Sequence, residues 1–205
     1  MIEPARLLIA TNNQGKLREY TALLVEQPFL LISLAQAGLA FEIEETASSM
    51  EENAVQKASA YAMMSGLITL ADDSGLEVDA LGGEPGPFSH RYAGEGVSDS
   101  YRNEYLLQKL QDVPREKRGA RFRCVIAIAT PWGGVETCEG VCEGVIAFEP
   151  KGAYGFGYDP VFHIPELGKR MAELTLDEKN MISHRARAAQ KAQLILRSLI
   201  YQDGT

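Results

Sequence analysis

Short apolar runs alternate along the chain with stretches of helical spacing. The apolar run at 7–10 predicts a buried strand, and apolar positions three and four apart over 17–24 predict a helix directly after it. A second helix is expected to begin at Ser49, where Glu52 three residues later forms a capping box, and to end near Gly66.

Another apolar run, at 67–70, leads into Ala71-Asp72-Asp73-Ser74-Gly75-Leu76. We expect a buried strand that ends in a sharp turn over 72–75. Ligands bind at the carboxyl ends of strands in open α/β sheets, and two adjacent carboxylates there would hold a proton or a divalent cation such as Mg²⁺. From this stretch alone, a hydrated turn without chemistry is an equally good interpretation.

The second half of the chain predicts a helix over 98–111 and a long hairpin made of strands 120–129 and 135–148. The hairpin is a candidate for a lobe extension or a dimer contact. Capping signals at Thr175 and Ser183 open a short helix and a final amphipathic helix. In the helix 98–111, four side chains are expected to face inward: Tyr101, Tyr105, Leu106 and Leu110.

Three polar or glycine-rich loops carry candidate binding residues. The loop 11–16 joins the first strand to the first helix, a position where backbone N–H groups can hold phosphate, although its spacing is not that of a Walker loop. Arg91 in the Gly- and Pro-rich loop 82–96 could pair with a phosphate. Glycines flank Phe156 in the loop 151–160, which offers a flat face for a base. An ordinary capped turn and a surface arginine are the alternatives for the first two.

Composition and charge narrow the class of protein. The chain has 205 residues, which suits a single domain over 1–205, and 28 acidic against 20 basic residues give a net charge of −8. This balance argues against a nucleic-acid polymer as partner. Three cysteines favour a reducing compartment, and the absence of a signal-peptide core or membrane span leads us to expect a cytoplasmic protein without a membrane partner.

Eight short motifs stand in a fixed order from the first strand to the last helix. They are Thr11-Asn12-x-x-x-Lys16, Glu44-Glu45-Thr46, Asn53-Ala54-x-x-Lys57-Ala58, Ala71-Asp72-Asp73-Ser74-Gly75-Leu76, Gly82-Gly83-x-Pro85-Gly86, Ser89-x-Arg91-Tyr92, Phe156-Gly157-Tyr158-Asp159-Pro160 and Ser183-His184-Arg185. No single motif is specific, but the ordered set closely resembles the inosine triphosphate pyrophosphatase family, also called the non-canonical purine NTP pyrophosphatases.

The resemblance implies a fold and a reaction. The fold would be a three-layer α/β structure with a mixed twisted sheet and two lobes flanking a nucleotide cleft, usually in a homodimer. The reaction would convert ITP, dITP or XTP and water to the monophosphate and pyrophosphate, with magnesium or manganese as the metal. Such an enzyme would cleanse the nucleotide pool.

The resemblance also implies roles for individual residues. Asp73 would be the catalytic carboxylate and, with Glu44, a ligand of the metal. The implied substrate-binding residues are Thr11, Asn12, Asn13, Gln14, Gly15, Lys16 and Lys57 for the triphosphate, Ser74 beside Asp73, and Arg91, Phe156, Gly157, Tyr158, Asp159, Lys179, His184 and Arg185 for the base and the rest of the nucleotide. The chain departs from the family pattern at Ala47, Met50 and Arg170.

Two alternatives differ from this activity in class or substrate. A nucleotide-binding sensor would keep the pocket without catalysis, but the set Lys16, Glu44, Asp72 and Asp73 favours an enzyme. A pyrophosphatase of other nucleotides would keep the phosphate site and change the base pocket. Arg185 and the first N–H groups of the last helix can only donate hydrogen bonds, which suits the 6-oxo group of hypoxanthine or xanthine. Guanine shares this group, and the sequence does not indicate how GTP is excluded.

Overall fold

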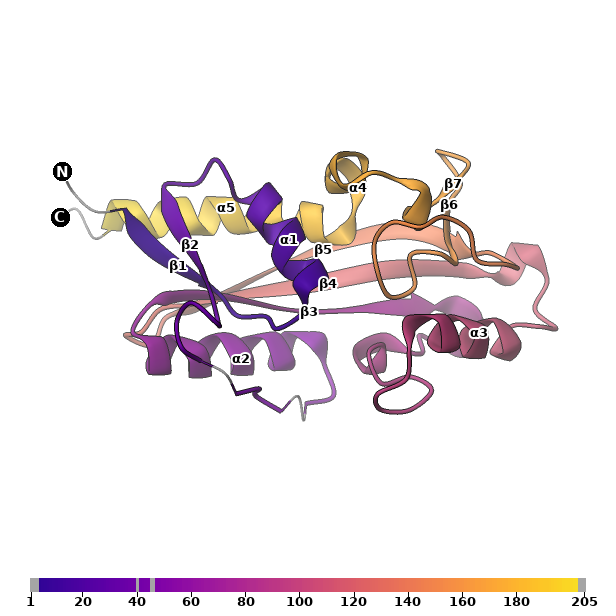
Figure 1. The fold of residues 1–205 in the computed structure, drawn as a ribbon, viewed down its shortest axis with the longest axis horizontal. Helices are drawn as coiled ribbons and strands as arrows, with labels where there is room; N and C mark the ends of the chain where they lie inside the picture. Colours follow the sequence, from indigo (N-terminus) through magenta and orange to yellow (C-terminus); the bar gives the residue numbers. More distant parts are fainter. Residues whose placement is uncertain (1–3, 40, 45–46, 203–205) are drawn as a thin grey trace. The chain divides into compact units, whose positions relative to one another are not determined.

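The computed structural model of the chain describes residues 4–39, 41–44 and 47–202 (Figure 1). The chain divides into two compact units. Unit 1 comprises Met1–Asp73, Cys124–Gly140 and Arg185–Thr205, and unit 2 comprises Ser74–Arg123 and Val141–His184. The strands β3, β4 and β5 contain residues of both units.

A parallel core of strands organises unit 1. β1 (Ala5–Ile9) pairs in parallel with β2 (Phe29–Ser33) on one side and with β3 (Ile68–Val78) on the other. The unit's helices are α1 (Gln14–Leu23), α2 (Met50–Ser65) and α5 (His184–Gln202), whose first residue belongs to unit 2. The predicted first strand and the helix that follows it correspond to β1 and α1, so this connection is confirmed.

Apolar side chains of these strands pack on both faces of the sheet. Leu70 lies in a cluster with side chains of α1 and α5, whereas its neighbour Ala71 lies in a second cluster with side chains of α2. This follows from the alternation of side chains along a strand. Unit 1 therefore has three layers, with α1 and α5 on one face of the sheet and α2 on the other (Figure 1).

Unit 2 is built from the remaining strands and helices around a core of its own. Its α-helices are α3 (Asp99–Lys109) and α4 (Leu176–Ile182), and short 3₁₀ helices cover Asp79–Leu81, Gly86–Phe88, Arg115–Lys117 and Met171–Glu173. Its strands are β6 (Phe162–Ile164) and β7 (Lys169–Arg170), together with residues 74–78 of β3, 119–123 of β4 (Gly119–Ala129) and 141–146 of β5 (Val135–Ile146). The β5–β6 and β6–β7 pairs are antiparallel.

All seven strands of the described chain belong to one sheet, in the order β2-β1-β3-β4-β5-β6-β7. Because its pairs are parallel around β1 and antiparallel around β6, the sheet is mixed. The predicted α/β class with a mixed sheet is confirmed, whereas the single domain and the cleft between two lobes stay predictions. None of the helices that the structure describes is long and apolar enough to cross a membrane.

Local capping signals fixed several helix ends correctly. The hydroxyl of Ser49 accepts a hydrogen bond from the Glu52 amide at the start of α2, and Gly66 closes this helix with a left-handed φ of 67°. Thr175 and Glu178 form the predicted capping box of α4. These ends depend on residues within one helical turn, so the sequence alone is sufficient to place them.

The side of α3 that faces inward differs from the prediction. Tyr101 is 54% exposed, so its predicted inward position is wrong. Leu106 and Leu110 are buried as predicted, but they share the interior with two polar side chains, Arg102 and Asn103. A helical pattern of apolar residues cannot reveal that a polar side chain has partners elsewhere in the fold.

The predicted turn over 72–75 is also wrong, because β3 continues as a strand to Val78. Asp72 and Asp73 are only 2% and 4% exposed. A strand can carry such carboxylates through the interior only where cations or hydrogen-bond donors compensate for the loss of water. Since neighbouring residues of a strand point to opposite faces, the two aspartates do not share one binding position.

Candidate functional site

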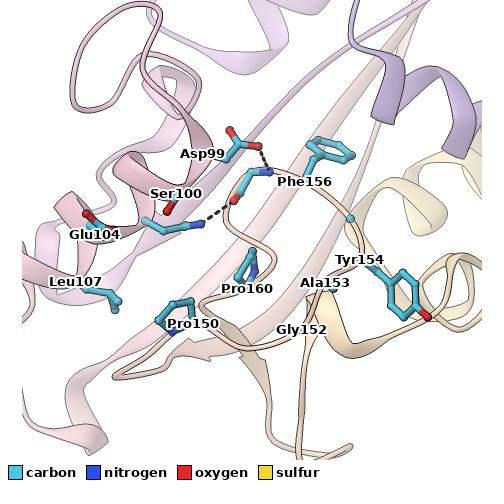
Figure 2. A pocket seen from close by; sticks show the side chains of 13 residues that line it. Asp99, Ser100, Glu104, Leu107, Pro150, Gly152, Ala153, Tyr154, Phe156 and Pro160 are labelled. Carbon is cyan, nitrogen blue, oxygen red and sulfur yellow. Dashed lines mark hydrogen bonds between the residues drawn. The ribbon is translucent and has the colours of Figure 1, made fainter.

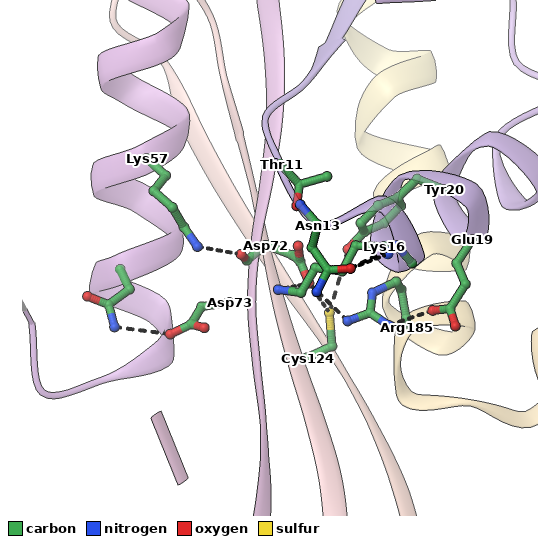
Figure 3. Close-up of polar contacts among 12 residues, drawn as sticks. Thr11, Asn13, Lys16, Glu19, Tyr20, Lys57, Asp72, Asp73, Cys124 and Arg185 are labelled. Atoms are coloured by element: carbon green, nitrogen blue, oxygen red, sulfur yellow. Dashed lines mark hydrogen bonds and ion pairs between the residues drawn. The ribbon is translucent and has the colours of Figure 1, made fainter. Parts of the chain in front are cut away.

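Asp72 lies at the centre of a cluster of charged side chains in unit 1 (Figure 3). One carboxylate oxygen, Oδ2, lies 3.1 Å from the Lys16 ammonium and accepts a hydrogen bond from the Arg185 guanidinium at 3.3 Å. The same oxygen accepts from the thiol of Cys124 at 3.7 Å. From the other face of the sheet, Lys57 donates to the backbone carbonyl of Asp72 at 2.7 Å. Elements far apart in the sequence thus converge on one aspartate.

This environment determines which groups of the cluster carry charge. Burial alone would raise the pKa of Asp72, but the positive charges of Lys16, Arg185 and Lys57 more than offset it and hold this pKa below its usual range. Burial, together with the Asp72 charge, raises the pKa of the Cys124 thiol to about 12. At neutral pH the cluster therefore contains an ionised Asp72 beside a protonated, unreactive Cys124.

Arg185 is held between two carboxylates rather than exposed to solvent. Its side chain is 1% exposed, and its two terminal nitrogens donate to Glu19 at 2.5 Å and to Asp72 at 3.3 Å. Burial would lower the pKa of Arg185, but Glu19 and Asp72 raise it well above the ordinary value. Glu19 was not predicted as a site residue, although it lies three residues after Lys16 and is followed by the inward-facing Tyr20. An acidic residue on the apolar face of a predicted helix was the available signal.

Asp73 points to the opposite face of the sheet, toward α2 (Figure 3). The Asn53 side-chain amide donates to its Oδ2 at 3.0 Å. The amide oxygen of Asn53 accepts from the backbone N–H of Ala47 at 3.0 Å, so both ends of this amide are used and its orientation is set. Asn53 stood in a quoted motif but was not proposed as a site residue. Its contact identifies it as a group that orients the Asp73 carboxylate.

The loop between β1 and α1 is a tightly capped turn. The side-chain oxygen of Asn13 accepts hydrogen bonds from the backbone N–H groups of Gly15 at 2.8 Å and Lys16 at 3.1 Å. The backbone N–H of Asn13 donates to the Thr11 hydroxyl at 3.2 Å. Two other predicted residues of this loop are exposed: Asn12 and Gln14. A capped turn explains the backbone hydrogen bonds of this loop. It does not explain the contact between Lys16 and Asp72.

A second group of predicted residues lies in unit 2, around the loop that carries Phe156. The backbone N–H of Phe156 donates to Asp159 Oδ2 at 2.9 Å, and the buried Lys179 ammonium donates to the same oxygen at 2.5 Å. That ammonium also lies 4.8 Å from the centre of the Phe156 ring. The Tyr158 hydroxyl donates to the backbone carbonyl of Ser89 at 2.9 Å. The structure therefore brings Phe156, Asp159 and Lys179 into direct contact.

The remaining predicted residues of unit 2 have more varied positions. His184 is buried and stacks on the ring of Phe122, with ring centres 4.8 Å apart and planes at 18°. Arg91 is exposed, with its guanidinium 5.1 Å from the centre of the Phe88 ring. Ser74 is half-buried in β3. None of these observations tests a role in nucleotide binding, which stays a prediction for all three.

The predicted metal site is only partly described. Glu44 is exposed, and its motif neighbours Glu45 and Thr46 lie outside the described residues. Within the described part of the chain, no three His, Cys, Asp or Glu side chains are grouped so that they could hold a metal ion. Mg²⁺ needs only one or two carboxylates, because waters and substrate phosphates fill its other positions. Asp72 Oδ1 is also buried without a hydrogen-bond partner among the described residues, but it lies on the opposite face of the strand from Asp73 and does not add to this site.

The fold and the charged cluster together define a class of protein. A strand, a capped turn carrying a lysine and a helix N-terminus stand beside buried carboxylates on a parallel strand. This arrangement suits an α/β protein that binds the phosphates of a small molecule.

Comparison with known proteins identifies the family. Residues 7–194 match the model of the Ham1 family. A dITP/XTP pyrophosphatase of Desulforamulus reducens is 49% identical over 199 residues, which cover 97% of this chain and 99% of that protein. One of Bacillus subtilis is 48% identical over 196 residues, covering 96% and 99%. A HAM1 protein from Coxiella burnetii has a similar structure, with a TM-score of 0.86 at 40% identity over 95% of this chain and 99% of that one. The chain belongs to the Ham1 family, and the resemblance inferred from its motifs is confirmed.

Proposed function

We propose that this chain hydrolyses the non-canonical purine nucleotides dITP, ITP and XTP to their monophosphates and pyrophosphate. The names of the relatives from Desulforamulus reducens and Bacillus subtilis support this substrate class, since both are dITP/XTP pyrophosphatases. The observation that carries the proposal is the cluster around Asp72, which brings Lys16 to the buried Asp72 carboxylate and Lys57 to the backbone carbonyl of the same residue, next to the buried Asp73. A sensor without catalysis has no need of such a costly cluster.

The cations of unit 1 would bind the triphosphate. Lys16 stands at the first turn of α1, where the helix dipole also favours an anion, and its side chain is still 15% exposed. Lys57 reaches the same strand from α2. Positioning and neutralising the phosphates is the main requirement for phosphoryl transfer, and these two residues supply fixed positive charge for it.

Asp73 would accept the proton of the attacking water. Its carboxylate is held by Asn53, so the catalytic group does not need to be oriented during the reaction. Asp73 and Glu44 would hold Mg²⁺ or Mn²⁺, since these ions prefer carboxylate oxygens. The metal, when bound, would neutralise negative charge on the phosphate oxygens.

The base would be bound by residues of unit 2. Phe156 offers a ring for stacking, and Lys179 offers a donor to a 6-oxo purine. The contacts of Arg185 with Glu19 and Asp72 support a different role for this residue, which is to position Asp72. His184 keeps its proposed role beside the base.

We further propose that the protein is a cytoplasmic homodimer and that each chain forms a single domain. The three cysteines of the chain are free thiols in the structure, which supports a reducing compartment. The dimer rests on the family resemblance alone. Light scattering of the purified protein at several concentrations would test it, and a single monomer mass throughout would contradict it.

A panel of nucleotides tests the function. The protein would be incubated with Mg²⁺ and dITP, XTP, ITP, dGTP or dATP, and kcat/KM determined for each. We expect dITP, ITP and XTP to be favoured over dGTP and dATP. Tight binding of dITP without turnover would support the sensor instead, and a preference for dATP or dGTP would contradict the proposed substrate class. Asp73→Asn, prepared in the same way, controls for contaminating enzymes.

A further inference from the structure

The loop that carries Phe156 has no regular structure of its own to fix its shape. Residues 151–161 contain no helix or strand, and Gly157 has a left-handed φ of 62°. A loop of this kind takes its conformation from contacts with its neighbours. The question for base binding is therefore which side chains hold it in place.

Two side chains of α3 hold both backbone groups of Gly157 (Figure 2). Asp99 Oδ2 accepts from the Gly157 N–H at 2.7 Å, and the Asn103 side-chain amide donates to the Gly157 carbonyl at 3.0 Å. The two residues are four apart, so they lie on one face of the helix. Gly157 immediately follows Phe156, and these bonds therefore fasten the peptide next to the aromatic ring.

The holding side chains are themselves fixed. The Ser98 hydroxyl caps the N-terminus of α3. The other carboxylate oxygen of Asp99 accepts a hydrogen bond from the Arg102 guanidinium at 2.5 Å, and this guanidinium also donates to the Val97 carbonyl at 3.1 Å. Asn103 is 4% exposed, and its Nδ2 must face the Gly157 carbonyl to donate. Asp99 itself is exposed, and its bonds explain the burial of Arg102 and Asn103, which the apolar pattern of the helix did not predict.

Packing does little to support the loop on this side. A pocket of about 360 Å³ lies between α3 and the loop, lined by Ser100, Glu104 and Leu107 from the helix and by Pro150, Tyr154 and Pro160 from the segment before β6. Figure 2 shows these side chains around the space, with the two bonds to the backbone beside Phe156 at its edge. Where van der Waals contacts are missing, the hydrogen bonds carry the restraint.

We infer that Asp99 and Asn103 are positioning residues that set the orientation of the Phe156 ring and thereby the affinity for the purine base. This inference rests on the proposed function. The ring has Lys179 against it, and the Phe156 N–H is bonded to Asp159, so a shift of the Gly157 peptide would move the ring relative to both. Loss of a bond here weakens binding of the base and leaves the phosphate-binding groups of unit 1 unchanged.

The test compares four variants with the wild type. Asn103→Ala and Asp99→Ala each remove one bond to Gly157, whereas Asp99→Asn keeps an oxygen that can accept from its N–H. Glu104→Gln is the matched control, because Glu104 lies in the same helix and lines the same pocket and has no hydrogen bond to the loop among the described residues. For each protein, KM and kcat for dITP would be measured, with the inhibition constant of inorganic tripolyphosphate, which has no base.

Each alanine variant is expected to raise the KM for dITP by about 3- to 10-fold, the effect of one hydrogen bond, with kcat changed by less than about 2-fold. The inhibition constant of tripolyphosphate should stay constant, and Asp99→Asn should recover most of the lost affinity. An unchanged KM in both alanine variants, or an equal weakening of tripolyphosphate, would overturn the inference. If only one alanine variant folds, it gives the same test by itself. A wild type that does not turn over dITP would contradict the proposed function, and with it this inference.

Discussion

The strongest quantitative prediction concerns the buried pair of Glu19 and Arg185. Both side chains are almost fully buried, at 4% and 1% exposure, and the pair joins α1 to the start of α5. We consider the substitution Glu19→Ala, which removes the carboxylate and leaves the guanidinium in place. Asp72, at 3.3 Å, then still accepts a hydrogen bond from Arg185.

The magnitude follows from the burial. Removing one partner of a buried ion pair costs about 3–5 kcal/mol of unfolding free energy, because the other charge loses its compensation. Since Asp72 still compensates for part of the Arg185 charge, we expect the lower end, about 3 kcal/mol. For a chain of this size, 1 kcal/mol corresponds to about 2–4 °C, so Tm should fall by about 6–12 °C. Glu19→Gln keeps an accepting oxygen and should lose less than half as much free energy.

Thermal and denaturant unfolding followed by circular dichroism measure this change. The control is Asp79→Asn, which breaks the exposed ion pair with Arg121 and should change stability by less than about 1 kcal/mol. Because Arg185 positions Asp72 in our account, the Glu19 variants should lower kcat for dITP and for dATP by the same factor. A Glu19→Ala protein as stable as the Asp79→Asn control would refute the reasoning about the buried pair. A loss of activity confined to dITP would return Arg185 to a role in reading the base.

Three further predictions concern catalysis, the metal and the cysteines. Asp73→Asn should lose about 10²–10⁴-fold in kcat, the contribution of one acid–base group, with an unfolding midpoint close to that of the wild type; near-normal turnover at saturating Mg²⁺ would remove Asp73 from the mechanism. Dialysis against EDTA should abolish activity, and added Mg²⁺ should restore it without refolding; full activity after chelation would argue against a metal. Burial raises the pKa of Cys124 to about 12 and that of Cys138 to about 11, so at pH 8 both stay protonated and native protein should react with iodoacetamide far more slowly than unfolded protein. Equal rates in both states would contradict the raised pKa values of these thiols.

The sequence was informative where structure depends on nearby residues. The ends of α2 and α4 follow from capping residues within one turn, and they lie where the sequence predicted them. The mixed α/β fold and the family followed from the ordered motifs, and the comparisons confirm both. The relatives from Desulforamulus reducens and Bacillus subtilis are named dITP/XTP pyrophosphatases, which agrees with the activity that the resemblance implied.

Capping signals and short motifs did not predict contacts between residues that are distant in the sequence. The predicted turn at Asp72 failed because its compensating cations come from Lys16 in α1 and Arg185 in α5. Glu19 was overlooked since its partner Arg185 lies 166 residues later. The sequence around Asn103 indicates only a polar residue in a helix. Its bond to Gly157, 54 residues away, is what connects it with the proposed base-binding loop. In each case a buried polar side chain depends on a partner that no local pattern contains.

The division of roles between the two units stays a proposal. Charged residues that suit phosphates are grouped in unit 1, and the Phe156 loop with its aromatic ring lies in unit 2. The substitutions of Glu19 and Asn103 separate these roles, because the first should affect all nucleotides alike and the second should change mainly the KM for substrates that carry a base.

The central claim is tested most directly by the products formed from dITP. Purified protein would be incubated with dITP and Mg²⁺, and dIMP, dIDP, pyrophosphate and inorganic phosphate would be separated and quantified over time. The account predicts dIMP and pyrophosphate in equal amounts from the earliest time points, without dIDP. Formation of dIDP with inorganic phosphate, or dITP recovered intact, would contradict the assignment of this chain as a nucleoside-triphosphate pyrophosphatase.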